Sequence, residues 1–545
     1  MAMTGNETPR ASRVRRLKSF LVLLCILAPS AWMIATIPPL WRDADAYVQL
    51  TENPLVATFW GHAPAYCHIA KLPLYAGEQL ERWRGNTPAN REPGSSQPAL
   101  TDSGIWLLIS GQHLGMDLAV FCFITAVTGL FSIRLALSLI WASNALFYTF
   151  AHCIGSETLG MILIVVLALK AVRLIQKSDG AGWTDWYIFA VVLVLCLLSR
   201  DLNLALVALL PAALLISSTL QLIAKQGRRS LATADFRQAV IAMAVGVACV
   251  GVAHSIPQDL AHKTRLHPHS RIGFTFLWRL HFLSDLPADS RTALLRRVSA
   301  SSQSDDVRRL IALLEQMLVE KADLSNPTPL LQRAISSFGG SLYWENLDRS
   351  LNQMAFAFLW PPSPELRHAI RTDLVTGLMQ PSTLISEYLF ATTAYYFPHE
   401  AEMPACANLV TFRGDMNADK ISQLPFRYRY FHLWQGLSYS RAFFLWLGSG
   451  LVFLVVARRK LTSASAIAGL GVGLTVAGLM IFAATCVLHD YEPRFSLSMW
   501  ELLFLSFFLF AGATADLLTE RRSMLLPPSE PGKESPPGSH CRPEP

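Results

Sequence analysis

The stretch "FLVLLCILAPSAWMIATIPPL", residues 20–40, indicates that the chain enters a membrane near its N-terminus. It is apolar throughout and as long as the roughly 20 residues that a helix needs to cross a bilayer. Five basic residues precede it in "RASRVRRLK", residues 10–18. The run is too long for the apolar part of a cleaved signal peptide and lacks a convincing cleavage site. We therefore expect a retained anchor, with residues 1–19 in the cytoplasm.

The composition of the whole chain agrees with this first segment. Of 545 residues, 52% are hydrophobic and only 16% are charged, and the mean hydropathy is +0.34. A soluble protein of this size carries more charge, so a polytopic membrane protein is expected. The net charge of +7 does not indicate nucleic-acid binding, because the basic residues cluster beside the apolar runs, as topology signals do.

Ten apolar runs are predicted to form membrane-spanning helices in an all-α fold. They cover residues 20–40, 114–131, 133–151, 159–175, 187–199, 202–224, 239–253, 443–457, 464–488 and 496–518. The connections expected inside, such as 170–177 and 225–237, hold several Lys or Arg residues, whereas the short connections expected outside hold at most one each. The alternation predicts ten spans with both termini in the cytoplasm.

Two long segments are predicted on the outer side, at residues 41–104 and 255–440. The second carries helical patterns in "DDVRRLIALLEQMLVEKADL", residues 305–324, and in "SPELRHAIRTDLVTGLM", residues 363–379. Both outer segments are expected to be helix-rich, separated by spans within 105–254 and followed by spans within 441–518. The tail at 519–545 is rich in proline and is expected to be disordered.

Polar residues gather where this topology predicts the outer membrane boundary. "WRDADAY", residues 41–47, places Asp43 and Asp45 directly after the first span. Ionisable groups cost about 2.5–3.5 kcal/mol each at the centre of a span on insertion scales, so their clustering at one level predicts a shared polar cavity. The other residues predicted at this level are Asp117, at the start of the second span, and His152, Glu157, Arg200, Asp201, Asn203, His489, Asp490, Tyr491, Glu492, Arg494 and the slightly deeper Glu501.

The arrangement resembles the GT-C superfamily of membrane glycosyltransferases, which includes the protein O-mannosyltransferases, the lipid A aminoarabinose transferases and the oligosaccharyltransferase catalytic subunits. The resemblance covers most of residues 20–224 and 489–518 and rests on topology and on four short motifs. These are "WRDADAY", "GSETL" at 155–159, "LLSRDLNLALVALLP" at 197–211 and "YEPRFSLSMWELLF" at 491–504. The family has an acidic residue in the first outer loop, where it acts as a base or positions the acceptor. Protein O-mannosyltransferases usually carry Asp-Glu there. This chain has Asp-Ala-Asp, which leaves open whether Asp43 or Asp45 serves.

The expected activity is the transfer of a sugar from a polyprenyl-phosphate donor to a glycan, lipid or protein acceptor. The lipid holds the donor at the membrane boundary, where a carboxylate can take the proton of the acceptor hydroxyl. Arg200 and Arg494, with His489 next, are the candidates for holding the leaving phosphate. Inversion at the anomeric carbon needs a single base. We expect this chemistry on the outer face of a bacterial inner membrane. The remaining polar residues expected to line the cavity are His152, Glu157, Asp201, Asp490, Tyr491 and Glu492.

Each candidate also has a purely structural interpretation. Asp43 and Asp45 could form a solvated helix end, and Glu157 could be a helix N-terminal charge. "DAD" also matches the metal-binding DxD of nucleotide-sugar enzymes, but those have a soluble Rossmann-like domain that this pattern lacks, so no cofactor is expected and a divalent metal stays only as an alternative. The other structural interpretations are an ion pair of Arg200 with Asp201, a packing or hydrogen-bonding role for His152 and a pairing of Glu501 with Arg494.

Two rival functions remain open at this point. A transporter, flippase or polysaccharide polymerase would also have many spans and outer loops, although a transporter should place ionisable groups near the midplane. A non-catalytic relative of the same superfamily would keep the fold and serve as an assembly subunit.

Overall fold

The computed structural model of the chain describes most of the predicted spans and much of the outer segments. The described residues are 9–36, 39–41, 49–51, 53, 64–86, 97–177, 182–223, 229–264, 271–302, 304–322, 324–338, 344–379, 439–457 and 461–525. For some residues at helix ends, among them Asp201, only the backbone is described. Asp43 and Asp45 lie outside the described residues.

Long helices form the body of the protein. In chain order they are α1 (Pro9–Thr36), α6 (Asp102–Val127), α7 (Phe131–Ala142), α8 (Ala145–Ala151), α9 (Ser156–Gln176), α10 (Trp183–Ser199), α11 (Leu209–Ile223), α12 (Arg229–Thr264), α22 (Tyr439–Ala457), α23 (Leu461–Leu488) and α24 (Leu497–Leu525). The 3-10 turn η1 (Asp201–Ala208) leads from α10 into α11, and η7 (Pro493–Ser496) leads into α24.

Each of the ten predicted spans overlaps one of these helices. Seven helical segments among the described residues are long and apolar enough to cross a membrane, and α7 with α8 makes an eighth if the bent pair counts as one span. The apolar stretches in α10 and α22 are shorter. The chain is thus an all-α polytopic membrane protein, and the number of ten crossings stays a prediction.

Three details differ from the sequence-based expectation. Helix α1 ends at Thr36, and Leu40 belongs to a strand, because a proline pair follows the helix. The run at 133–151 is broken by a 65° bend, where Asn144 caps the new helix α8 by accepting a hydrogen bond from the Leu146 backbone. Helix α6 begins at Asp102 and not near 114, so Asp117 lies in the middle of a helix and not at its outer start.

The early start of α6 has a packing cause. Helix α5 (Lys71–Trp83), which follows α4 (Pro64–Ile69) in the first outer segment, packs along the first turns of α6. Leu74 of α5 shares a small buried core with Ile105 and Ile109 of α6. These contacts extend the helix beyond the part that the bilayer requires.

A two-residue parallel pairing joins the end of the first span to the connection between α8 and α9. Strand β1 (Leu40–Trp41) pairs with β2 (Cys153–Ile154), with Leu40 opposite Cys153 and Trp41 opposite Ile154. The Leu40 amide also donates to the His152 carbonyl at 3.1 Å. The start of "WRDADAY" therefore lies beside the start of "GSETL", more than 100 residues away in the sequence.

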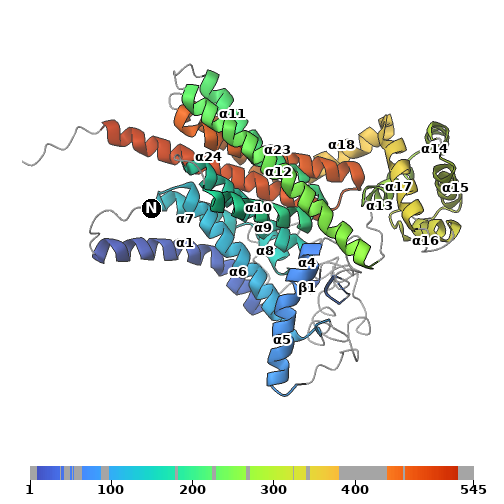
Figure 1. The fold of residues 1–545 in the computed structure, drawn as a ribbon, viewed down its shortest axis with the longest axis horizontal. Helices are drawn as coiled ribbons and strands as arrows, with labels where there is room; N and C mark the ends of the chain where they lie inside the picture. Colours follow the sequence, from blue (N-terminus) through green and yellow to red (C-terminus); the bar gives the residue numbers. More distant parts are fainter. Residues whose placement is uncertain are drawn as a thin grey trace, which may run out of the picture.

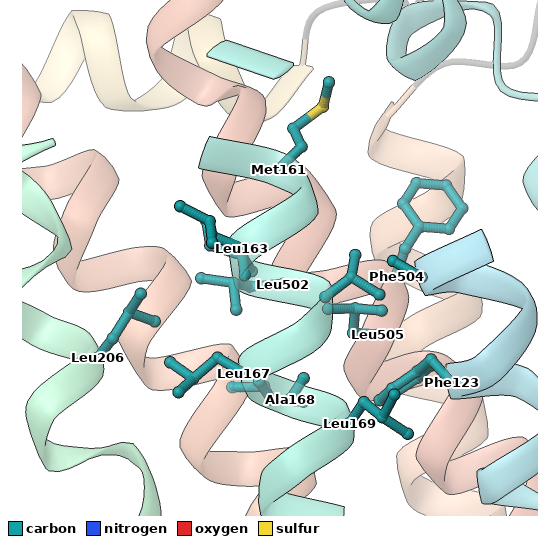
Figure 2. Packing of buried hydrophobic residues seen from close by; sticks show 14 of the residues in the cluster. Phe123, Met161, Leu163, Leu167, Ala168, Leu169, Leu206, Leu502, Phe504 and Leu505 are labelled. Atoms are coloured by element: carbon teal, nitrogen blue, oxygen red, sulfur yellow. The ribbon is translucent and has the colours of Figure 1, made fainter. Parts of the chain in front are cut away.

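Helix α9 lies at the centre of the main core. Figure 2 shows its side chains, from Met161 to Leu169, between Phe123 of α6, Leu206 of η1 and residues Leu502 to Leu505 of α24. On the other side of the bundle, α23 crosses α11 so closely that a Cβ at Gly469 would lie 2.2 Å from the Ala213 carbonyl oxygen. Small residues at such a crossing let helices approach without a large side chain between them.

The second outer segment folds into helices with a core of their own. They are α13 (Arg271–Arg279), η2 (Leu280–Leu283), α14 (Ala288–Ser301), α15 (Asp305–Val319), α16 (Thr328–Ser337), α17 (Trp344–Leu359) and α18 (Pro364–Met379). The helices predicted at 305–324 and 363–379 are confirmed as α15 and α18. The first of them buries Leu310 and Leu314, which share a core with Phe276 and Met354.

The two ends of the bundle carry different parts of the chain. In Figure 1, α1 begins and α24 ends at the left end of the bundle, while α5 and α14–α17 lie toward the right. This agrees with both termini on one side of a membrane and the two outer segments on the other.

Cysteine labelling tests this topology. We expect a membrane-impermeant maleimide to label Trp83→Cys and Val319→Cys from the outside of intact cells, because these side chains are 84% and 83% exposed and belong to the outer helices. Trp183→Cys, at the first residue of α10 and 90% exposed, should be labelled only after the cells are opened. The measurement uses a background without reactive native cysteines. Labelling of Trp183→Cys in intact cells would contradict the ten-span topology.

Candidate functional site

The first turn of α9 and the end of α10 are joined by an ion pair. Nη2 of Arg200 donates to Oε1 of Glu157 at 2.9 Å, and the Glu157 side chain is only 2% exposed, while Arg200 is 22% exposed. Glu157 lies in the first turn of α9, where a carboxylate also meets the positive end of the helix dipole. The helix-end interpretation of Glu157 is therefore correct but incomplete, because the same carboxylate binds an arginine 43 positions away.

The turn that carries Arg200 is rigidly held. Asn203, which is fully buried, donates from Nδ2 to the Cys196 carbonyl at 2.8 Å and to the Ser199 hydroxyl at 3.3 Å. The backbone N–H of Asn203 donates to the Arg200 carbonyl at 3.1 Å. These bonds satisfy carbonyl groups at the C-terminus of α10. The side chain of Asp201 lies outside the described residues, so the expected Arg200–Asp201 pair stays a prediction.

A second carboxylate approaches Arg200 from α24. Glu501 is fully buried, and neither of its oxygens has a hydrogen-bond partner among the residues that the structure describes. The cation that interacts with it is Arg200. The expected pairing of Glu501 with Arg494 is therefore wrong, because Arg494 precedes α24 and contacts Glu492. Arg200 thus forms an ion pair with Glu157 of α9 and interacts electrostatically with Glu501 of α24.

The connection between α23 and α24 forms another polar group. Nδ1 of His489 lies 2.6 Å from Oδ1 of Asp490, and Nε of Arg494 lies 2.7 Å from Oε2 of Glu492. The Arg494 guanidinium also lies over the ring of Phe495, 5.1 Å from its centroid. Tyr491 packs edge-on against Phe482 with ring centroids 6.0 Å apart. Tyr491 thus has a packing contact in α23, while Arg494 remains partly exposed.

The outer helices dock on this connection through residues that the sequence analysis missed. Trp278 of α13 stacks on the His489 ring, with centroids 5.3 Å apart and planes 14° apart. Arg279 is 2% exposed, donates to the Asp373 carboxylate of α18, and lies 3.3 Å from the His489 carbonyl oxygen. Burial raises the pKa of Asp373 above its ordinary value, and the charge of Arg279 opposes that rise. The sequence signal was weak, a single arginine in the apolar stretch "FTFLWRLHFL".

His152 belongs to a third polar group, inside the bundle. It is fully buried, and its Nδ1 lies 3.1 Å from Nε2 of His113 on α6. Nδ1 of His113 in turn lies 2.8 Å from the Ser30 hydroxyl of α1. The expected packing or hydrogen-bonding role of His152 is confirmed.

The sequence-predicted residues therefore fall into separate groups. One group contains Glu157, Arg200 and Glu501. A second, against the docked outer helices, contains His489, Asp490, Glu492 and Arg494. The third contains His152 and His113. Arg200 and Arg494, predicted to share one phosphate, are each neutralised by their own carboxylate partners. In the described ranges, no three His, Cys, Asp or Glu side chains are placed to hold a metal ion.

Chemically, the Glu157–Arg200–Glu501 group offers a guanidinium held in place by one ion pair. A fixed, partly exposed guanidinium at the end of a helix suits recognition of a phosphate or carboxylate. The segment that starts at Trp41 is attached beside it by the β1–β2 pairing.

Comparison with known proteins identifies no relative. No protein-family model matches the chain, and neither the curated proteins nor the solved structures include a significant match.

The buried pair that docks the outer helices allows a stability test. Asp373→Ala should lower the free energy of opening at the junction by about 3–5 kcal/mol, because it leaves the buried Arg279 charge without its partner. Hydrogen exchange of the α13 and α18 amides measures this opening. Arg308→Ala breaks an exposed pair with Asp305 and should cost less than about 1 kcal/mol. Equal effects of the two substitutions would contradict the role of Arg279.

Proposed function

We propose that the protein is an inverting glycosyltransferase that uses a polyprenyl-phosphate-linked sugar at the outer end of the bundle. One observation carries the proposal: the pairing of Trp41 with Ile154 attaches the start of "WRDADAY" close to the ion pair of Glu157 with Arg200. The acidic motif expected to supply the base and the arginine expected to hold the phosphate thus belong to neighbouring segments.

Chain length limits how far these groups can be apart. Two residues separate Asp43 from Trp41, which allows about 7 Å between their Cα atoms, and three residues separate Glu157 from Ile154, which allows about 11 Å. Two paired strands lie about 5 Å apart. Arg and Asp side chains add several ångströms of reach. A sugar phosphate between the two segments is therefore compatible with the observed pairing.

The reaction needs only two protein groups in direct roles. The acceptor oxygen attacks the anomeric carbon as the bond from that carbon to the phosphate oxygen breaks, and a carboxylate of Asp43 or Asp45 takes the acceptor proton. Polyprenyl phosphate leaves with the bonding electrons. Arg200 would bind the leaving phosphate, with Arg494 and His489 as further candidates. Glu157 would hold the Arg200 guanidinium in position.

The membrane setting supports a lipid-linked donor. The polyprenyl chain would lie among the apolar helices, and the phosphate would stay at the boundary where Arg200 is partly exposed. We place the outer end on the periplasmic face of a bacterial inner membrane, with a glycan, lipid or protein as acceptor.

A transporter or flippase is the second candidate function. The observation that favours it is Asp117, a fully buried carboxylate in the middle of α6, because ionisable side chains inside a bundle often mark transport pathways. Sugar transfer by the purified protein would decide between the two functions.

The acidic motif is tested by two conservative substitutions. Asp43→Asn keeps the size of the side chain but removes the base, so sugar transfer should fall by roughly a hundredfold to ten-thousandfold, whereas Asp45→Asn should cost much less. The assay follows the release of polyprenyl phosphate from synthetic polyprenyl-phosphate hexoses by purified protein in detergent. Both single variants and the double variant are compared for yield and thermal stability. Normal turnover in all three would rule out a base in this motif.

Arg200 is tested by replacement with alanine and lysine. Arg200→Ala should abolish transfer, and Arg200→Lys should restore only part of it, because lysine lacks the planar fork that binds two phosphate oxygens. Arg494→Ala tests the second candidate in the same assay. The exposed Arg308→Ala serves as the matched control and should be fully active. If the double variant of Arg200 and Arg494 to alanine transfers sugar normally, neither arginine holds the phosphate.

A further inference from the structure

We propose that Asp117 is a proton-binding site inside the membrane bundle, and that His152, His113 and Ser30 pass protons to it from the outer end. The inference does not depend on the glycosyltransferase proposal. It rests on a row of four buried polar side chains that come from three separate segments of the sequence: α1, α6 and the residue after α8.

The first two contacts in this row of side chains are hydrogen bonds. Nδ1 of His152 and Nε2 of His113 are 3.1 Å apart, and Nδ1 of His113 and the Ser30 hydroxyl are 2.8 Å apart. Ser30 also offers its hydroxyl to the Asp117 carboxylate. That last contact is not a well-formed hydrogen bond here, and within the described residues both Asp117 oxygens lack one. The carboxylate is fully buried.

The row of side chains begins at the outer end of the bundle and ends inside α6. His152 follows α8 at the point where its carbonyl accepts from Leu40, next to the β1–β2 pairing at the outer end. His113 and Asp117 lie one helical turn apart on α6, and Asp117 is the fifteenth residue after Asp102. At 1.5 Å per residue, Asp117 is about 22 Å along the helix from its outer start. The residues buried beyond it on α6 are all apolar: Ala119, Val120, Phe123, Ile124 and Val127.

The hydrogen bonds of this chain are self-consistent in two opposite directions. In one, Nδ1–H of His152 donates to His113, Nδ1–H of His113 donates to Ser30, and the Ser30 hydroxyl proton is free to point at Asp117. In the other, protonated Asp117 donates to Ser30, Ser30 donates to His113, and Nε2–H of His113 donates to His152. Ser30 has one hydroxyl proton, so it can donate to only one neighbour at a time.

One proton taken up from outside converts the first arrangement into the second. It binds Nε2 of His152, whose Nδ1 proton moves to Nε2 of His113. The Nδ1 proton of His113 moves to the Ser30 oxygen, and the hydroxyl proton of Ser30 moves to Asp117. The net change is one bound proton and one neutralised carboxylate, with both imidazoles again neutral. No other co-reactant is needed.

The surroundings favour a proton as the ligand of Asp117. An ionised carboxylate without a partner is very costly in an apolar interior, and protonation is the usual escape. Among the described residues, the helices packed against this part of α6 supply no Lys or Arg to Asp117. Two other buried carboxylates of the bundle, Glu157 on α9 and Glu501 on α24, interact with Arg200: Glu157 through an ion pair and Glu501 electrostatically. The titratable side chain that contacts His113 is His152.

Infrared spectroscopy of the full-length protein in nanodiscs tests the site. We expect a protonated-carboxyl band that grows as the pH is lowered, disappears in Asp117→Asn and persists in Asp285→Asn, which changes an exposed aspartate of the outer helices. Asn is nearly isosteric with the protonated acid, so the variant should fold. A titrating band that is unchanged in Asp117→Asn would overturn the proposal, and so would the absence of any titrating carboxyl band.

The relay is tested separately by the rate of proton uptake after a pH jump. His113→Gln should slow the growth of the Asp117 band by roughly a hundredfold, the lower end of the effect of removing a proton-transfer group. His281→Gln, in the outer helices, is the matched control and should leave the rate unchanged. The final amplitude should be the same in all three proteins. Uptake at the wild-type rate in His113→Gln would refute the route through the histidines.

Discussion

The ion pair between Glu157 and Arg200 is the contact on which the outer end of the bundle depends. Arg200 ends one helix, and Glu157 begins another, so their 2.9 Å contact fixes the end of α10 against the start of α9. The β1–β2 pairing ends three residues before Glu157 and attaches the end of the first span to the same place. An unpaired charge at this depth is costly, so each of these segments is constrained to keep the pair intact.

The same constraint explains the position of the outer helices. Their own core would allow them to fold without touching the spans, but Arg279 at their base is buried and needs Asp373 and the His489 carbonyl. Close packing adds to this, because a Cβ at Gly377 of α18 would lie 2.2 Å from the Phe482 ring of α23. The docked helices thereby hold the connection that carries His489 and Arg494.

Helix α1 takes part in both of the proposed activities. Its Ser30 belongs to the proton-binding chain, and a few residues later the chain enters β1 and the acidic motif. The His152 carbonyl that accepts from Leu40 belongs to the same residue that starts the histidine chain. Protonation of Asp117 would therefore change the hydrogen bonding of Ser30 on α1, the helix that leads into the proposed catalytic segment.

Several features followed from the sequence because they depend on local properties. Two apolar runs, at 20–40 and 496–518, and the amphipathic pattern of α15 are examples. They reflect how readily consecutive residues leave water for an apolar environment, which does not depend on which helices pack against them. The grouping of "WRDADAY", "GSETL" and "SRDLN" at one membrane level followed from counting spans and charges in the same way.

Only the tertiary structure decided which of these residues meet. Glu501 is seven positions from Arg494 but faces Arg200, 301 positions away, because the path of η7 and the rotation of α24 set its direction. Asp117 lies inside α6 and not at its start because α5 packs on α6 and moves the start of that helix outward. The role of Arg279 was hardly predictable from the sequence, because an arginine in an apolar stretch does not indicate its partner. The fold places Asp373 against it. Pairings of this kind depend on how helices cross, and no local pattern in a single sequence encodes that geometry.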